Sequence, residues 1–521
     1  MPLAEAPLDN PPKATTVAAI DLGSNSFRMV IAEVLPDGRV EVLERLQRAV
    51  RLGQDTFRRG RLGGQSMRAA VGVLRDYRQL LKLYSVERIR AVATSAVREA
   101  SNSDNFLDRI FMATGIQVEV ISTSQESRLT TSAVRQAVGD ALAMDRGDVM
   151  IADVGGGSTL LTVLHEGKLA ASQSLSLGSI RLQEMLLTSE ETPARSAELL
   201  RQHIANETTS LKGSLPLDAV RSFVAIGGDA RFVARQIGKP TASEELAIVD
   251  PAEFDKLVRR CIRLTPEELG KRHGLTFAEA ETLNPALLVY QSMLRKTKAE
   301  QMAVSYVSMR DGLLLELARD VTGEEDRVLL DSAIDSATAI GEKYHIDMEH
   351  ASHVADLAVR LFDELQADHG LGARHRLLLR VAGLLHEVGG FVSNRAHHKH
   401  SYYLISNAEV FGLGPDEIMI VAQVARYHRR SPPKRSHVEF MALPRETRVA
   451  VSKLAALLRM ADALIRGHAR LAADFRFERR GDELTIYMPG AADLLLEHRA
   501  VASKGDLFED IYGIKVRLEG A

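Results

Sequence analysis

The sequence has a single cysteine, Cys261, no tryptophan, and an aromatic fraction of only 5%. One cysteine cannot form a disulfide bond within the chain, so cross-links of this kind are excluded. Few aromatic side chains leave little surface on which bases could stack, which makes specific nucleic-acid binding a weak prediction. No apolar run reaches the roughly 18 to 20 residues that a membrane-spanning helix needs, so we expect no membrane partner.

The sequence also lacks an excess of charge of either sign, with Lys+Arg 66 against Asp+Glu 69. No long-range field would therefore attract a polyanion, and any anion site must be local. The first 14 residues have neither the basic segment nor the apolar segment of a signal peptide. We therefore expect a cytoplasmic protein.

The 521 residues are 45% hydrophobic and 26% charged, which is typical of a globular protein with several domains. Strands and helices alternate in the first half, which indicates an α/β fold. Helices rich in histidine follow, and an alternating pattern at the end indicates a small α+β unit. The domain boundaries that we predict are 15–137, 138–323, 324–470 and 471–521.

A strand–turn–strand pattern occurs twice in the α/β half. Residues 21–26 (Asp-Leu-Gly-Ser-Asn-Ser) separate the apolar runs 16–20 and 27–34, and residues 153–159 (Asp-Val-Gly-Gly-Gly-Ser-Thr) follow another apolar run. The repetition indicates a duplicated lobe. A glycine turn leaves backbone N–H groups free and lets a phosphate approach closely, so two facing turns could hold a phosphoanhydride.

Asp21 and Asp153 each stand where the first strand of such a pair ends. Carboxylates in that place could hold Mg²⁺, or Mn²⁺, directly or through water. A single turn of this kind is more often an ordinary hairpin, whereas two copies favour the phosphate site.

Three segments are similar to motifs of the exopolyphosphatase and guanosine pentaphosphate phosphohydrolase family: 19–27, 93–98 and 153–159. Residues 342–347 and 385–389 extend the resemblance over nearly the whole chain, which favours the long, multidomain type. The family belongs to the actin-like ATPase superfamily. The resemblance therefore implies two ribonuclease-H-like lobes with the active site in the cleft between them, and a homodimer.

The resemblance makes Glu126 the catalytic carboxylate that deprotonates water; from the residues alone, it could equally be a capping-box partner at a helix start. Arg98 could neutralise a phosphate or form a surface salt bridge, and Glu99 is expected to face solvent. The expected phosphate contacts are Gly23, Ser24, Asn25, Ser26, Arg28, Thr94, Ser95, Arg98, Gly155, Gly156, Gly157, Ser158, Thr159, Gly227 and Gly228.

Two positions depart from the family pattern. Leu160 stands where the family commonly has a glutamate that supports the metal or the water, and leucine cannot bind Mg²⁺. Residues 227–229 (Gly-Gly-Asp) replace a Ser-Gly-Thr type sequence, so phosphate or nucleotide contacts there could differ.

The histidine-rich region resembles an HD-type phosphohydrolase domain, because His350, His386-Glu387 and Asp462 follow that motif order with Glu387 in place of the aspartate. Such a set suits Mn²⁺, Fe²⁺ or Zn²⁺, and a second position could be completed by His398, His400 and His428. The alternative is that these histidines are structural and that the domain helps to bind the substrate tail and a partner subunit.

The predicted function is release of terminal orthophosphate from inorganic polyphosphate. Hydrolysis of guanosine pentaphosphate to the tetraphosphate uses the same chemistry and is the second candidate. Basic runs within 45–61 and 426–435 favour the polymer, if folding aligns them with the cleft. The alternative that is not primarily an enzyme is a weakly active sensor that binds polyphosphate or a guanosine phosphate alarmone.

Overall fold

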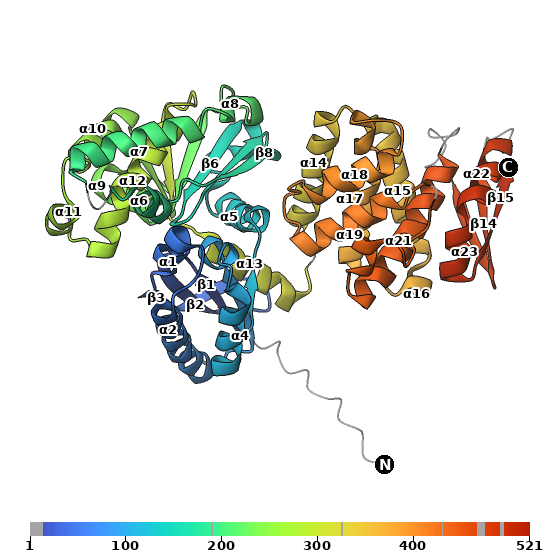
Figure 1. Ribbon diagram of the computed structural model, residues 1–521, viewed down its shortest axis with the longest axis horizontal. Helices are drawn as coiled ribbons and strands as arrows, with labels where there is room; N and C mark the ends of the chain where they lie inside the picture. The colour runs from blue at the N-terminus through green and yellow to red at the C-terminus, as the bar shows by residue number, and fades with distance from the viewer. Residues whose placement is uncertain are drawn as a thin grey trace, which may run out of the picture. The chain divides into compact units, whose positions relative to one another are not determined.

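The computed structural model describes residues 14–188, 191–324, 327–429, 431–465, 475–489 and 494–520. The chain forms two compact units, Met1–Val328 and Leu329–Ala521 (Figure 1). The predicted boundary between 470 and 471 lies outside the described residues, and the other predicted boundaries stay predictions. Within the described ranges, no helix is both long enough and apolar enough to cross a membrane.

The first lobe of the first unit is built on a five-stranded sheet. The strand order is β3-β2-β1-β4-β5, where β1 and β2 are antiparallel, β2 and β3 are antiparallel, and β1, β4 and β5 run parallel. The strands are β1 (Thr15–Leu22), β2 (Ser26–Val34), β3 (Val40–Ala49), β4 (Arg88–Ala93) and β5 (Val118–Val120). Its helices are α1 (Leu52–Arg59), α2 (Gly64–Leu83), α3 (Ser95–Arg98), α4 (Ser103–Thr114) and α5 (Thr123–Val138).

The second lobe repeats this plan in a seven-stranded sheet. Within the order β10-β11-β12-β9-β6-β7-β8, the series β8-β7-β6-β9-β12 has the same strand directions as β3-β2-β1-β4-β5. The strands are β6 (Asp148–Val154), β7 (Thr159–His165), β8 (Lys168–Leu175), β9 (Ser222–Ile226), β10 (Lys239–Pro240), β11 (Leu246–Val249) and β12 (Met302–Ser305). The repeated order confirms the prediction of an α/β half with two duplicated lobes.

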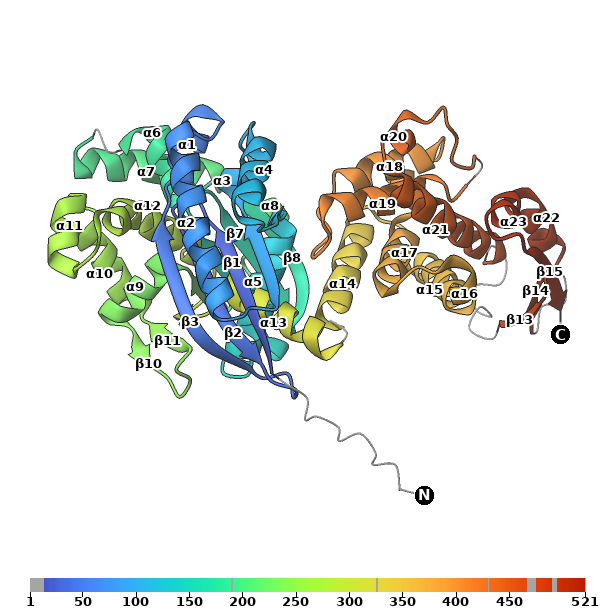
Figure 2. The same cartoon turned by 90° about the horizontal axis from the view of Figure 1, so that it is seen from below.

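Helices cover the sheet of the second lobe, and Figure 2 shows the same fold from below. They are α6 (Ser179–Leu186), α7 (Pro193–Glu207), α8 (Leu211–Ser214), α9 (Gly228–Ile237), α10 (Pro251–Cys261), α11 (Pro266–His273) and α12 (Phe277–Leu294), with a short 3-10 turn at Met144–Arg146. Apolar side chains from one face of the sheet and from α9, α10 and α12 form one core. That core fixes the position of the β6–β7 and β9–α9 turns.

Helix α13 (Met309–Thr322) follows the second lobe in sequence but packs against the sheet of the first. Leu313 and Leu317 share a buried cluster with Val17 and Val30 of β1 and β2. Gly312 permits this packing against α5, because a Cβ atom there would overlap the backbone of Leu129. The chain thus returns to the first lobe after completing the second.

The second unit contains the histidine-rich helices and a small sheet. The helices are α14 (Arg327–Lys343), α15 (Met348–Glu364), α16 (Gln366–His369), α17 (Ala373–Leu385), α18 (His397–Ser406), α19 (Pro415–Arg426), α20 (Val438–Met441) and α21 (Arg445–Leu464), with a 3-10 turn at Val388–Phe391. Near the C-terminus come β13 (Arg476–Arg480), β14 (Glu483–Met488), α22 (Leu495–Lys504), α23 (Asp506–Tyr512) and β15 (Lys515–Gly520). The three strands form one sheet. Kinship with HD-type domains stays a prediction.

Candidate functional site

A cavity of about 390 Å³ lies between the two lobes of the first unit. The β1–β2, β6–β7 and β9–α9 turns line it, together with the starts of α5 and α13. The predicted residues that the structure brings together there are Asp21, Gly23, Ser24, Asn25, Ser26, Arg28, Thr94, Ser95, Glu126, Asp153, Gly155, Gly156, Gly157, Ser158, Gly227 and Gly228. The paired turns therefore face one cavity, as the duplicated sequence pattern predicted.

The lobes touch at the glycine turn of the second lobe. A Cβ atom on Gly157 would overlap Ser95 and Phe57, and one on Gly156 would lie 3.1 Å from the Cβ of Ser24. The hydroxyl oxygens of Ser24 and Ser95 are 3.1 Å apart. Glycine is required here because only a residue without a side chain lets the two backbones approach so closely.

Arg181 of α6 joins the two lobes beside this turn. Its Nε donates to the carbonyl of Gly157 at 2.6 Å, and its Nη2 binds both carboxylate oxygens of Glu99 at 2.6 and 2.7 Å. The guanidinium also lies 4.2 Å from the centre of the Phe57 ring. Glu99, which we expected to face solvent, therefore forms an ion pair between the lobes although its side chain is 41% exposed.

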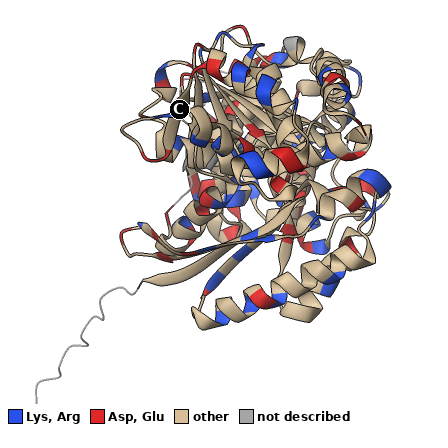
Figure 3. Ribbon diagram, turned by 90° about the vertical axis from the view of Figure 1, so that its left-hand side faces the viewer, with Lys and Arg blue, Asp and Glu red and all other residues tan. Residues whose placement is uncertain are grey.

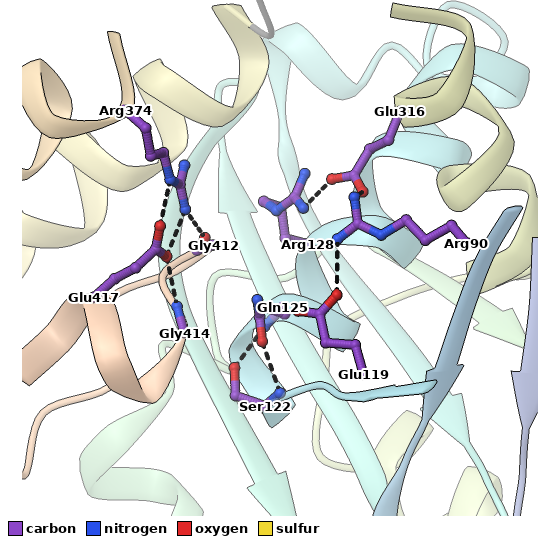
Figure 4. A network of polar contacts seen from close by, with 10 residues as sticks. All are labelled: Arg90, Glu119, Ser122, Gln125, Arg128, Glu316, Arg374, Gly412, Gly414 and Glu417. Carbon is purple, nitrogen blue, oxygen red and sulfur yellow. Dashed lines mark hydrogen bonds and ion pairs between the residues drawn. The ribbon is translucent and has the colours of Figure 1, made fainter. Parts of the chain in front are cut away.

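The N-terminus of α5 positions Glu126. Ser122 and Gln125 form a reciprocal capping box: the Ser122 hydroxyl accepts from the Gln125 N–H at 3.2 Å, and Gln125 Oε1 accepts from the Ser122 N–H at 2.9 Å (Figure 4). The capping-box partner is therefore Gln125, and the alternative role that the sequence left open for Glu126 is filled by its neighbour. The Glu126 carboxylate instead lines the cavity.

Behind the cavity, charged side chains join α5 to α13. Arg128 forms a buried ion pair with Glu316, and Arg90 Nη1 lies 2.6 Å from Glu316 Oε2 (Figure 4). Because α5 carries Glu126 and α13 carries Arg310, this network fixes two sides of the cavity relative to each other.

Burial raises the pKa of Glu126 to about 7, and the nearby carboxylates of Asp153 and Asp21 act in the same direction. Arg98 opposes this effect, with its Nη1 3.5 Å from Glu126 Oε2. The same Nη1 donates to the carbonyl of Ile121 at 2.7 Å. A carboxylate with a pKa near 7 is suited to accept a proton at neutral pH.

Arg98 and Thr159 differ from the prediction of phosphate contacts, because neither lines the cavity. Arg98 is turned toward Glu126 and Ile121, where it is held by the hydrogen bond and the ion pair just described. Thr159 is fully buried at the start of β7, and its hydroxyl donates to the carbonyl of Leu177 at 2.9 Å. Successive side chains of a strand point to opposite faces, so Ser158 reaches the cavity and Thr159 does not.

Sequence reasoning missed several charged residues of the cavity. Asp229 and Arg231 come from α9, directly after the third glycine turn, and Arg310 comes from α13. Burial raises the pKa of Asp229 to about 7 and that of Asp153 to about 6. The Gly-Gly-Asp sequence could have identified Asp229 as a residue of the cavity, because the other two turns also combine aspartate with glycine.

Arg310 is ion-paired with Asp21, with Nη1 and Oδ2 3.3 Å apart. No local motif marks Arg310, because the return of α13 to the first lobe is what brings it to β1. Arg28, Arg231 and Arg310 together place positive charge on the cavity wall. On the side of the protein that Figure 3 shows, Lys and Arg are mixed with Asp and Glu, which agrees with local attraction of an anion.

The carboxylates of the cavity fit a hard divalent cation. Asp21, Glu126 and Asp153 offer the oxygen ligands that Mg²⁺ prefers. Burial raises the pKa values of Glu126 and Asp153, so a bound cation would stabilise their ionised forms. Leu160 pairs directly with Asp153 across β6 and β7 and is buried, so an apolar side chain occupies the position beside this carboxylate.

In the second unit, His350, His386 and Glu387 lie together, with potential ligand atoms all within 4.8 Å of one another. Asp462, predicted to complete this set, forms a buried ion pair with Lys504 of α22 instead. His428 packs against His386 with ring centres 5.0 Å apart.

Comparison with known proteins agrees with this arrangement. The sequence profile of the Ppx/GppA phosphatase family matches residues 30–320, and that of Ppx/GppA phosphatase, domain III, matches residues 334–503. Exopolyphosphatase 2 of Mycobacterium tuberculosis is 31% identical over 320 residues, covering 58% of this chain and 99% of the relative. A guanosine-5'-triphosphate,3'-diphosphate pyrophosphatase of Vibrio vulnificus is 25% identical over 484 residues, covering 90% and 91%.

Among solved structures, an exopolyphosphatase from Cytophaga hutchinsonii has the same fold, with a TM-score of 0.53 and 22% identity over 60% of this chain and 99% of the other. The profile over residues 30–320 spans both lobes and the cavity between them. This chain therefore belongs to the Ppx/GppA phosphatase family.

Proposed function

We propose that this chain is an exopolyphosphatase, which hydrolyses the terminal phosphoanhydride bond of inorganic polyphosphate. The observation that carries the proposal is the Glu126 carboxylate, with 16% of its side chain exposed and a pKa of about 7, on the wall of a cavity lined by two glycine turns and by arginine side chains. This combination places a proton acceptor beside groups that can donate hydrogen bonds to phosphate oxygens. The name of the Mycobacterium tuberculosis relative supports the same activity.

The mechanism follows from these groups. Backbone N–H groups of the turns and the guanidinium groups of Arg28, Arg231 and Arg310 hold the terminal phosphoryl group. Glu126 accepts a proton from a water molecule, whose oxygen bonds to the terminal phosphorus while the bond from phosphorus to the bridging oxygen breaks. The bridging oxygen leaves with the shortened chain, and orthophosphate is released.

Asp21 and Asp153 are the residues that would hold Mg²⁺, directly or through its waters. When bound, the ion would neutralise the charge that develops on the phosphoryl and bridging oxygens. The chain itself contributes three things: the turns position the phosphate, arginine side chains neutralise its charge, and Glu126 accepts the proton.

Guanosine pentaphosphate is the second candidate substrate, because the name of the Vibrio vulnificus relative indicates hydrolysis of a guanosine phosphate. Purified protein should be given both substrates in one reaction, with orthophosphate and the guanosine products measured separately. We expect a higher kcat/KM for polyphosphate, and preferential conversion of the nucleotide would reverse the assignment. Binding of either compound without turnover would favour the sensor.

The pH dependence should report the ionisation of Glu126. The carboxylate must be ionised to accept a proton, and its pKa is raised to about 7, so kcat/KM should fall about tenfold per pH unit below about pH 7 and level off above it. The measurement is a pH–rate profile at several Mg²⁺ concentrations, extrapolated to low Mg²⁺, because a bound cation would lower the pKa of Glu126. An acidic limb near the ordinary carboxyl pKa of 4.5 would contradict the assignment.

Leu160 should limit the affinity for the metal ion. In Leu160→Glu, a carboxylate would stand directly across the strand pair from Asp153, so the Mg²⁺ concentration that gives half of the maximal rate should fall about 10-fold, which corresponds to about 1.4 kcal/mol. Leu160→Gln is the matched control, with similar size and no charge. Equal Mg²⁺ dependence in the two variants would show that this position does not support the cation.

We also propose, on the family resemblance, that the protein is a cytoplasmic homodimer and that the helices of the second unit are related to HD-type domains. The helical content of residues 327–464 supports the last of these. Sedimentation at several concentrations would test the dimer.

A further inference from the structure

The histidine cluster of the second unit lies where three segments meet. His350 is in the first turn of α15, and His386 and Glu387 follow α17 directly. Helices α15 and α17 are closely packed at Gly383, where an added Cβ would lie 2.7 Å from the Cα of Ala355. This close approach brings the start of one helix to the end of the other, and with them the two histidines.

The ring of His386 is held in the orientation of a metal ligand. Its Nδ1 lies 2.6 Å from the carbonyl oxygen of Gly383, so Nδ1 carries the proton and donates it to that carbonyl. The tautomer leaves a lone pair on Nε2. His386 is 0% exposed, and its Nε2 has no hydrogen-bond partner among the described residues. A buried acceptor without a partner costs free energy unless something occupies the space in front of it.

Backbone contacts of this kind are characteristic of metal-binding histidines. One ring nitrogen donates to a carbonyl, and this hydrogen bond orients the ring so that the other nitrogen points at the ion. His428 repeats the arrangement, with Nδ1 2.6 Å from the carbonyl of Ala425. Its Nε2 also carries a lone pair and lies 3.1 Å from His397 Nε2. Arg429 donates to His397 Nδ1 at 3.2 Å, which leaves the proton of His397 on Nε2 and directed at His428.

The surroundings favour a cation. His386 directly follows the last residue of α17, and His428 lies two residues after the end of α19. Helix C-termini carry partial negative charge. Glu387 adds a full negative charge. The three potential ligand atoms lie within 4.8 Å of one another, so small side-chain rotations would bring them to the roughly 2.0 to 2.2 Å from one ion that nitrogen and oxygen ligands need.

We propose that His350, His386 and Glu387 bind one divalent transition-metal ion, such as Zn²⁺, Co²⁺ or Mn²⁺, in the second unit. Two imidazoles and one carboxylate suit these ions better than Mg²⁺, which prefers oxygen ligands throughout. Asp462 is not a ligand, because Lys504 neutralises it. The ion would tie α15 to the end of α17, separately from the phosphate cavity in the first unit.

The test is uptake of metal by the full-length protein. After treatment with a chelator, the protein should be titrated with Co²⁺, while bound metal is measured by elemental analysis and ligand geometry by visible absorption. We expect one Co²⁺ per chain with the absorption of a site containing nitrogen ligands, in addition to any Co²⁺ held by the carboxylates of the phosphate cavity, and a higher temperature of unfolding on binding. A wild-type chain that shows no Co²⁺ absorption of a site with nitrogen ligands would overturn the proposal.

Variants locate the site. His350→Gln and Glu387→Gln, both at half-buried positions, should each lose this Co²⁺ and its spectrum while keeping the wild-type circular dichroism. His498→Gln, at an exposed histidine of the same unit, is the matched control and should keep both. Asp153→Asn should also keep the signal, since it changes only the phosphate cavity. Retention of the Co²⁺ spectrum by both ligand variants would overturn the assignment.

Discussion

Glu126→Gln is expected to lower the kcat for orthophosphate release from polyphosphate by about 10²- to 10⁴-fold, the usual contribution of a general base. The amide is close to the carboxylate in shape but cannot accept the proton of the attacking water. Polyphosphate binding should persist, because the turns and arginine side chains that hold the phosphate are unchanged. The measurement pairs steady-state kinetics with equilibrium binding of polyphosphate.

Glu119→Gln is the matched control for this experiment. Glu119 lies on β5, immediately before α5, and its half-exposed side chain pairs with Arg90 at 3.5 Å. The control removes the same charge from the same segment and should leave kcat within about twofold, as expected for an exposed pair. If Glu126→Gln kept the activity of this control, another group would have to be the base.

Gly157→Ala is expected to reduce kcat/KM about 100-fold, the scale of effect that misplacement by about 1 Å can have. The added methyl group would overlap Ser95 and Phe57 of the first lobe, so the glycine turn must move away from its partner. That displacement separates the two turns that hold the phosphate and weakens the contacts of Arg181. Activity and phosphate binding should therefore fall together, unlike in Glu126→Gln.

Gly147→Ala supplies the control in the same lobe. A Cβ atom at Gly147 would meet nothing within 4 Å, so the same chemical change should be close to neutral there. Unfolding curves of both variants should show whether the second lobe keeps its stability. Wild-type kinetics in a folded Gly157→Ala protein would show that close approach of the lobes is unnecessary for the reaction.

The paired turns could be predicted from sequence because the information is local. An apolar run, an aspartate and a glycine-rich segment occur within a few residues of each other around Asp21 and again around Asp153. The duplication then indicated that the turns face one another, and the shared strand order of the two sheets agrees.

Features that depend on long-range packing were not predictable in this way. Arg310 reaches Asp21 only because α13 returns to the first lobe, and Lys504 reaches Asp462 from a helix of the C-terminal segment. A motif does not specify on which side of a strand each hydroxyl lies, so the bond from the Thr159 hydroxyl to the carbonyl of Leu177 could not be foreseen. The role of Gln125 in the capping box, which frees Glu126, likewise required the geometry of the helix start.

The most direct test of the central claim is a time course with long-chain polyphosphate and Mg²⁺, in which orthophosphate is measured and the remaining polymer is separated by length. We predict orthophosphate as the released product from the start, formed by the wild-type protein and not by Glu126→Gln. Release of no orthophosphate by the wild-type protein, or cleavage into internal fragments, would contradict the account.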